Sequence, residues 1–173
     1  MNNTRTFLGL SAGIIVAVAT IVPASADLVV GTAKSERLHG TIHADTIKGR
    51  GGADRIHASA GADRIFGDRG RDVLFGDSGD DLLSDGYHQA PIPEDSWTTA
   101  DVFYAGAGAD RVEVDGRDTV HAGPGADLIR VAFMRTGTEV SCGKGEDTLV
   151  SFSESQFDGT FVSCEHVRHH PAG

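Results

Sequence analysis

The residues of this sequence best suited to chemistry are carboxylates that recur every nine positions. Written in nines from Gly31, the first blocks are GTAKSERLH, GTIHADTIK, GRGGADRIH, ASAGADRIF, GDRGRDVLF and GDSGDDLLS. The sixth positions hold Glu36, Asp45, Asp54, Asp63, Asp72 and Asp81. Carboxylate oxygens are preferred ligands of hard cations such as calcium. A fold that stacks these blocks would therefore align carboxylates for cation binding.

Each block is expected to form a turn followed by a very short strand. The first six residues are mainly Gly, Ala, Asp, Ser and Arg, which build no core but accept tight turns. The last three have the form x-apolar-x, which gives a strand one inward side chain. The apolar residues are Leu38, Ile47, Ile56, Ile65, Leu74 and Leu83. Because one block buries almost nothing alone, the blocks must stack into an all-β solenoid.

Two blocks make one coil, so alternate strands would form two parallel sheets that face each other across an aliphatic core. The turns would form two long edges, each with a column of carboxylates about 4.8 Å apart. Like charges at that spacing repel one another. Calcium would relieve the repulsion, because it accepts carboxylate and backbone carbonyl oxygens together. Magnesium demands a tighter octahedral site, and zinc prefers a cluster of His or Cys.

The pattern returns less regularly after residue 100. Copies are centred on Asp101, Asp110, Asp118, Asp127 and Asp147, and the Asp118 copy is one residue short. The interval from Asp81 to Asp101 and the interval from Asp127 to Asp147 are equal in length. Each predicts two repeats plus two extra residues, with the Asp of the middle copy lost.

These blocks resemble the nonapeptide repeat of the RTX, haemolysin-type calcium-binding family of secreted bacterial proteins, Gly-Gly-x-Gly-x-Asp-x-apolar-x. GDRGRDVLF and GDSGDDLLS match this pattern best. The resemblance implies a right-handed parallel β-roll with several calcium ions between its turns. Taken by position in the repeat, the predicted metal ligands are Asp45, Asp54, Asp63, Asp72, Asp81, Asp110, Asp118 and Asp127.

The first two blocks depart from the family pattern. Lys34 and His43 replace Gly at the fourth position, and Glu36 replaces Asp at the sixth. We expect these blocks to form a cap that binds calcium weakly or not at all. The sequence contains no His-Glu-x-x-His, Gly-x-Ser-x-Gly or phosphate-loop motif, so no catalytic residue is predicted and the protein is expected not to be an enzyme.

The N-terminal residues have the form of a signal peptide. Arg5 precedes an apolar run over residues 7–22, and Ala24-Ser25-Ala26 provides a small-x-small cleavage site. Cleavage after Ala26 predicts a secreted, extracellular protein.

The two cysteines, Cys142 and Cys164, are then expected to form a disulfide, the usual state in an oxidising compartment. We expect this disulfide to pin a C-terminal cap to the last coil. His166, His169 and His170 are expected to lie in a solvated tail beyond it.

Net charge and composition limit the classes of molecule that the protein is expected to bind. The chain carries 25 acidic and 15 basic side chains, a formal net charge of −10, which repels nucleic acid and attracts cations. The segment 86–99 contains two of the five prolines and the only tryptophan, Trp97, and is predicted to be a surface loop.

Two alternatives to a plain calcium-binding protein remain open. In the first, the loop 86–99 binds a glycan or another cell-surface partner, and the protein is an adhesin or binding module. In the second, the protein is a polysaccharide-active enzyme on a β-helix.

The predicted organisation is a signal peptide at 1–26, regular repeats at 27–84, an inserted loop at 85–99, degenerate repeats at 100–150 and a cap with tail at 151–173.

Overall fold

The computed structural model describes residues 4–6, 26–86, 99–134, 137–152 and 160–170. The regular elements in this described part are all strands. They are β1 (Thr4–Thr6), β2 (Leu28–Val30), β3 (Arg37–His39), β4 (Thr46–Lys48), β5 (Arg55–His57), β6 (Arg64–Phe66), β7 (Val73–Phe75), β8 (Leu82–Ser84), β9 (Val102–Tyr104), β10 (Arg111–Gly116), β11 (Thr119–Pro124), β12 (Leu128–Met134), β13 (Glu139–Lys144), β14 (Thr148–Phe152), β15 (Thr160–Val162) and β16 (His166–His170). Among the described residues there is no helix long and apolar enough to span a bilayer.

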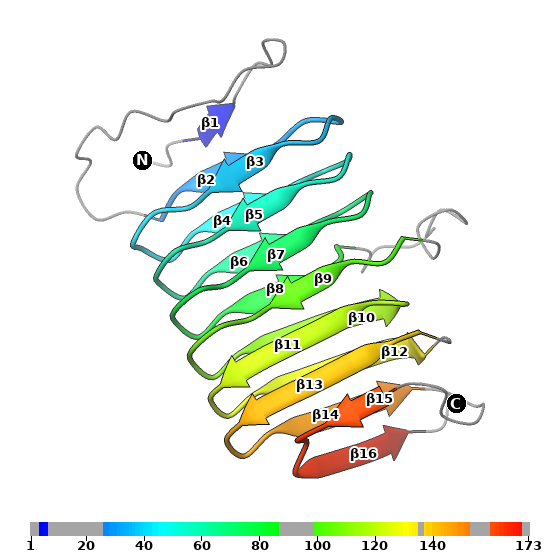
Figure 1. Ribbon diagram of the computed structural model, residues 1–173. Coiled ribbons are helices and arrows are strands. Elements are labelled where there is room, and N and C mark those ends of the chain that lie inside the picture. The colour runs from blue at the N-terminus through cyan, green and yellow to red at the C-terminus, as the bar shows by residue number, and fades with distance from the viewer. Residues whose placement is uncertain (1–3, 7–25, 87–98, 135–136, 153–159, 171–173) are drawn as a thin grey trace.

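The strands form two parallel sheets wound as one solenoid (Figure 1). The nine-stranded sheet has the order β1-β2-β4-β6-β8-β10-β12-β14-β16, and the seven-stranded sheet has the order β15-β13-β11-β9-β7-β5-β3. Residues at the same position of alternate repeats are direct partners, as in Ile47 with Ile65 and Ile56 with Leu74. The predicted all-β parallel solenoid is confirmed. The regular and degenerate repeats belong to one stack, because β8 pairs with β10 and β7 pairs with β9.

The core consists of two rows of aliphatic side chains, one from each sheet, packed between the sheets. The eighth residue of each regular repeat points inward, and Ile47, Ile56 and Ile65 are fully buried. The neighbouring strand residues Arg37, Arg55 and Arg64 are exposed, as an x-apolar-x strand requires. In the longer strands β10 and β12, Val114 and Val131 add further inward side chains. Each coil therefore contributes only a few core residues, and stability depends on the stack.

Fourth-position glycines allow the turns to stack closely. Gly70 has φ 136° and Gly79 has φ 131°, and a Cβ atom on either would overlap a carbonyl oxygen of the preceding coil. Only glycine combines this backbone conformation with such close approach. Lys34 and His43 hold the same position in the first coil, where no described turn precedes them. Their place at the end of the stack explains why the family glycine is absent there.

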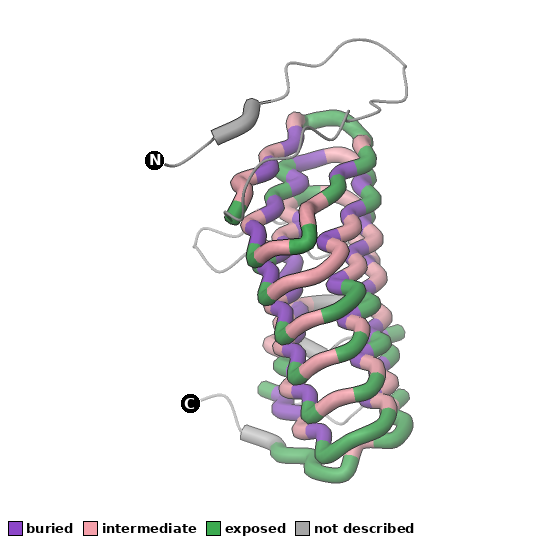
Figure 2. Tube along the Cα trace, turned by 90° about the vertical axis from the view of Figure 1, so that its left-hand side faces the viewer, coloured by how far each residue is buried: buried purple, intermediate pink, exposed green. Residues whose placement is uncertain are grey.

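We call the turns that follow even-numbered strands edge I and those that follow odd-numbered strands edge II. Edge I lies on the right of Figure 1 and edge II on the left. Viewed onto edge II, residues of the same burial class align in columns from coil to coil (Figure 2). The repeat thus places chemically equivalent side chains directly above one another.

One of the two long intervals was interpreted wrongly from sequence. β9 is the next strand of the path after β8, and the Asp72 N–H bonds Asp101 Oδ1 at 2.8 Å. The interval from Asp81 to Asp101 is therefore one turn of edge I with a long insertion, and not two repeats. Residues 87–98 of that insertion lie outside the described residues.

The interval from Asp127 to Asp147 does contain two repeats. The Asp127 N–H bonds Asp147 Oδ1 at 2.9 Å, so these residues occupy successive coils of edge II. Thr138, which is buried, stands between them at the sixth position on edge I. It replaces the expected aspartate.

The C-terminal residues extend the stack. β15 pairs with β13 and β16 with β14, both in parallel. His166, His169 and His170 lie in β16 and not in a tail as predicted, although His166 is exposed to solvent as expected. This last coil covers the one before it, and the Cys142–Cys164 disulfide joins the two.

Candidate metal centre

The sixth-position carboxylates form a hydrogen-bonded column along each edge. One carboxylate oxygen, Oδ1, accepts the N–H of the sixth residue in the preceding coil, as for Asp72 Oδ1 with Asp54 at 2.7 Å and Asp81 Oδ1 with Asp63 at 2.8 Å. Edge I carries Glu36, Asp54, Asp72, Asp101 and Asp118. Edge II carries Asp45, Asp63, Asp81, Asp110, Asp127 and Asp147. The parallel stacking predicted from the repeat is the cause of this register.

The second carboxylate oxygen has no protein partner in most of these turns. Oδ2 is buried and accepts no hydrogen bond in eight aspartates of the described part. They are Asp54, Asp63, Asp72, Asp81, Asp110, Asp118, Asp127 and Asp147. A buried carboxylate oxygen without a donor costs the folded state free energy, so each of these atoms requires a cation or a proton.

First-position glycines pack closely against these oxygens. A Cβ atom on Gly49 would lie 2.6 Å from Asp54 Oδ2 and 2.6 Å from the carbonyl oxygen of Gly67 in the next coil. A Cβ atom on Gly67 would similarly lie 2.7 Å from Asp72 Oδ2. A side chain at the first position would overlap both oxygens, so glycine lets a carboxylate oxygen and a carbonyl oxygen of the next coil approach the same point.

Burial raises the pKa of eight column aspartates, Asp54, Asp63, Asp72, Asp81, Asp101, Asp110, Asp118 and Asp127. It raises the pKa of Asp54 and Asp81 to about 7, an effect that the neighbouring carboxylates reinforce and that a backbone N–H partly opposes. The pKa of Asp118 is raised to about 7 and that of Asp101 to about 8, again chiefly by burial. Without a cation the columns hold protons near neutral pH, and a bound cation would displace them.

The donor set fits calcium. Within the described residues no three His, Cys, Asp or Glu side chains gather around one point, so carboxylates alone would not complete a site. Backbone carbonyls of the stacked turns would have to supply the remaining oxygens. Calcium accepts such a mixture in six- to eight-fold coordination, whereas zinc prefers a compact set of His or Cys ligands.

Comparison with known proteins agrees with this geometry. The RTX calcium-binding nonapeptide repeat matches the chain in four copies, at residues 30–65, 49–83, 98–116 and 112–130. The chain belongs to this family. No curated protein matches it at a significant level. Together, the family match and the stacked buried aspartates support a calcium-binding repeat protein.

Seven of the eight predicted ligands share the arrangement with a partnerless Oδ2. Asp45 differs, because its Oδ2 accepts the Thr41 N–H at 2.5 Å and the Thr41 hydroxyl at 3.0 Å. Glu36 is similar, since its Oε2 accepts the Thr32 N–H at 2.5 Å. In the first turn of each edge, protein donors therefore bond the carboxylate oxygen that has no donor in later turns.

Two sixth-position aspartates, Asp101 and Asp147, are absent from the predicted ligand set. Asp147 has the partnerless Oδ2, and the buried Asp101 fills the sixth position of the long turn. Both residues lie in recognisable repeats, but the long intervals that precede them interrupt the nine-residue spacing. Asp68 and Asp85 add carboxyl groups on edge I, and burial raises the pKa of Asp68. No nonapeptide rule marks these two, because they occupy the second and first positions of their turns.

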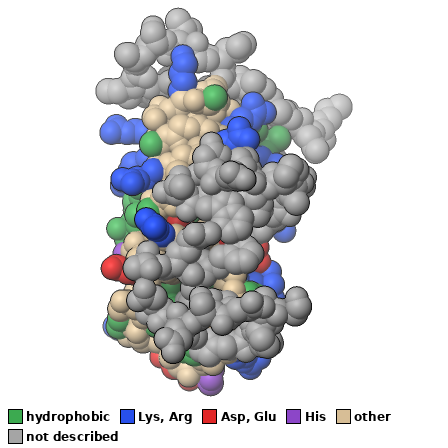
Figure 3. All heavy atoms as spheres, turned by 90° about the vertical axis from the view of Figure 1, so that its right-hand side faces the viewer, with side chains coloured by type: hydrophobic (Ala, Val, Ile, Leu, Met, Phe, Trp, Pro, Cys, Tyr) green, Lys and Arg blue, Asp and Glu red, His purple; other side chains and the backbone are tan. Residues whose placement is uncertain are grey.

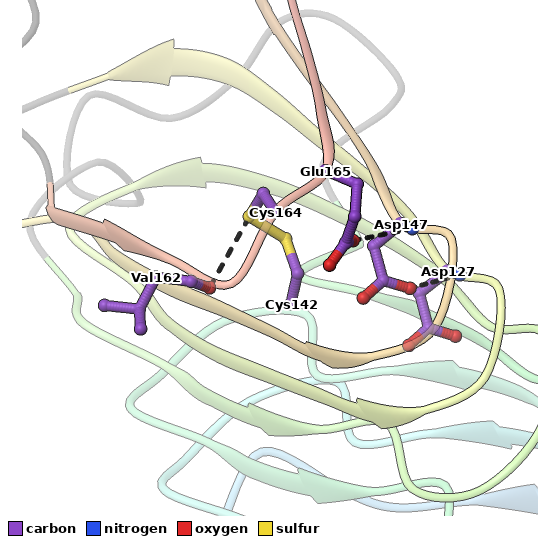
Figure 4. Close-up of a disulfide and its surroundings, with 6 residues drawn as sticks. All are labelled: Asp127, Cys142, Asp147, Val162, Cys164 and Glu165. Carbon is purple, nitrogen blue, oxygen red and sulfur yellow. Dashed lines mark hydrogen bonds between the residues drawn. A yellow bond between two sulfur atoms is a disulfide. The ribbon is translucent and has the colours of Figure 1, made fainter.

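The C-terminal coil closes the edge II column (Figure 4). Cys142 in β13 and Cys164, which follows β15, have their Cα atoms 5.1 Å apart. Glu165 Oε2 accepts the Asp147 N–H at 3.0 Å and so takes the place of a further aspartate. The predicted disulfide is confirmed, and it holds the last carboxylate in register.

The outer face of the seven-stranded sheet carries a ladder of stacked rings. His57 and Phe75 have ring centroids 4.2 Å apart, Phe75 and Tyr104 are 4.9 Å apart, and Tyr104 and His121 are 4.8 Å apart. His39 begins the ladder above His57. These ring faces pack on one another, so the ladder contributes to the stack.

On the face that carries edge I, Lys and Arg side chains stand out along the flanks of the solenoid (Figure 3). Twelve of the residues proposed for the loop 86–99, Trp97 among them, lie outside the described residues.

Proposed function

We propose that this protein is a secreted, non-enzymatic calcium-binding protein whose solenoid is completed by calcium ions held between successive turns. The eight buried, partnerless Oδ2 atoms carry the proposal. An ordinary folded protein pairs such atoms with donors, and a regular series of exceptions indicates a missing common partner.

In this proposal each site uses one turn and the next turn on the same edge. The first turn provides Oδ2 of its aspartate. The next turn provides the backbone carbonyl oxygen of its first residue. Asp54 Oδ2 and the Gly67 carbonyl oxygen both lie close to Gly49, and Asp81 Oδ2 and the Ala105 carbonyl oxygen both lie close to Gly76. Calcium would supply the positive charge that ionised columns lack, and the turns would fix the oxygens that surround it.

The same geometry makes folding dependent on calcium. Ionised carboxylates stacked along each edge repel one another in the absence of the ion and are buried at a cost. Binding therefore contributes directly to the free energy of folding. Extracellular modules function with dissociation constants of about 10⁻⁴–10⁻³ M, and we expect sites in that range.

Calcium titration calorimetry with circular dichroism tests the function. We expect several ions per chain and a gain of β-structure on adding calcium to the calcium-free protein, with a much smaller response to magnesium. The double variant Asp54→Asn and Asp72→Asn should bind fewer ions, whereas Glu139→Gln, an exposed control, should bind the normal number. A wild-type chain that binds no calcium, or is equally structured without it, would contradict the proposal.

Secretion rests on the N-terminal sequence and on the disulfide, which is typical of oxidising compartments. The mass of protein recovered from the medium of expressing cells tests it. A chain that starts at Asp27 is expected, and a full-length chain retained inside the cells would oppose the proposal.

A further inference from the structure

The second residue of the turn differs between the first turn of each edge and the later regular turns. In the first turn of edge II this residue is Thr41. Its N–H and hydroxyl both bond Asp45 Oδ2, and its hydroxyl oxygen also accepts the His43 N–H at 3.1 Å. In the first turn of edge I, Thr32 bonds Glu36 Oε2, and its hydroxyl accepts the Lys34 N–H at 3.3 Å. We call these two arrangements threonine clamps.

Later turns have a different backbone conformation at the same position. φ is positive at Arg50, Ser59, Asp68 and Asp77, with values from 63° to 86°, and at the glycines that follow in the degenerate repeats. Thr32 and Thr41 are absent from the positive-φ residues of the described part. In each regular turn with positive φ at this position, Oδ2 of the sixth residue has no donor.

The chemistry of threonine explains the difference. A β-branched side chain strongly disfavours positive φ, whereas Gly, Asp and Asn tolerate it more readily. In the first coil, Thr32 and Thr41 direct their N–H groups toward the carboxylates of their own turns. Thr41 then adds a hydroxyl donor, so Asp45 Oδ2 already has two donors from the chain itself.

We propose that the two threonine clamps substitute for metal, so that the first coil is a calcium-independent cap on which the calcium-dependent coils stack. This inference rests on the proposed function and specifies which turns lie outside it. It assigns Thr32 and Thr41 as the residues that exclude the ion and removes Asp45 from the ligand set. It also gives a rule for this chain: threonine at the second position marks a turn that needs no calcium.

The cap has a structural consequence for the rest of the solenoid. The Asp45 N–H bonds Asp63 Oδ1 and the Glu36 N–H bonds Asp54 Oδ1. An ordered first coil therefore presents the first donor of each column in the correct register before any ion is bound. The remaining turns can add to it in sequence as calcium becomes available.

A matched pair of variants tests the inference on the full mature chain. Asp45→Asn and Asp63→Asn change equivalent residues of adjacent coils on edge II, and both are almost completely buried. We expect Asp63→Asn to lower the number of calcium ions bound in calorimetry. Asp45→Asn should keep the wild-type number, and it should lower the melting temperature equally with and without calcium. Equal loss of ions in both variants would overturn the inference.

Hydrogen exchange in calcium-free buffer provides a readout that is independent of calcium binding. The amides of Thr32 and Thr41 should exchange more slowly than those of Arg50 and Ser59, the corresponding residues of the second coil. Thr41→Val, which replaces the hydroxyl by a methyl group and keeps the β-branch, should reduce this protection locally. Equally fast exchange at all four amides would overturn the inference. If wild type binds no calcium but the clamps are protected, the proposed function fails while the calcium-independent cap stands.

Discussion

In the absence of calcium, the protein should become less stable as the pH rises from 5 to 8. Burial raises the pKa of Asp54 and Asp81 from 3.8 to about 7 and that of Asp101 to about 8. The folded chain therefore holds more protons than the unfolded chain between these values. Stability is greatest where the columns are protonated, and it declines as the pH passes through the folded-state pKa values.

The size of this effect follows from the same values. A carboxyl group whose pKa rises from 3.8 to about 7 costs the folded state about 4 kcal/mol once it is ionised. Charges in one column interact, so these costs do not add independently. Each extra proton held by the folded state makes the free energy of unfolding fall by about 1.4 kcal/mol per pH unit. We expect at least that slope between pH 6 and 8.

The assay is urea unfolding followed by circular dichroism at several pH values, in calcium-free buffer and in excess calcium. Bound calcium replaces the protons, so the decline with pH should disappear above about pH 7 when calcium is saturating. Asp54→Asn removes one titrating group and should flatten the calcium-free slope, whereas Glu139→Gln should leave it unchanged. Calcium-free stability that is constant or increases from pH 5 to 8 would refute the reasoning.

Three further changes test the stack itself. Gly70→Ala should cost about 2–5 kcal/mol of unfolding free energy, because its Cβ adds overlap with Gly52 to the strain of positive φ. Gly137→Ala, with positive φ but no contact within 4 Å, should cost only about 1 kcal/mol, and equal losses would argue against close turn stacking. Replacing both cysteines by serine should cost about 3 kcal/mol and accelerate hydrogen exchange in β15 and β16, and unchanged exchange there would contradict a pinned last coil. Phe75→Ala should lose about 1–3 kcal/mol in thermal unfolding while calcium stoichiometry stays normal, and a lost ion would link the ladder to the sites.

Local spacing made much of the fold predictable. The nine-residue period determines which residues point inward, and Ile56 and Leu74 pack as direct neighbours as that period requires. It also separates alternate aspartates onto two edges, because each coil contains two turns. The eight predicted ligands could thus be located before their surroundings were known.

Insertions obscured the weaker half of the pattern. The interval from Asp81 to Asp101 suggested two repeats, but its extra residues form an insertion in a single turn. Length alone does not distinguish a long loop from a degenerate repeat, since both restore the register of the following strand. Pairing of β7 with β9 resolves the two cases.

The sequence by itself determined the repeat, the inward aliphatic side chains, the position of the carboxylates and the availability of two cysteines for a disulfide. These features depend on local period and residue type. The tertiary structure decided which carboxylate oxygens are left without a donor. That property depends on the coil before and the coil after, and on the sign of φ at the second position of each turn. Asp45 and Asp63 are equivalent in the repeat, yet only Asp63 has an open Oδ2, because Thr41 folds back on Asp45 and Ser59 does not fold back on Asp63.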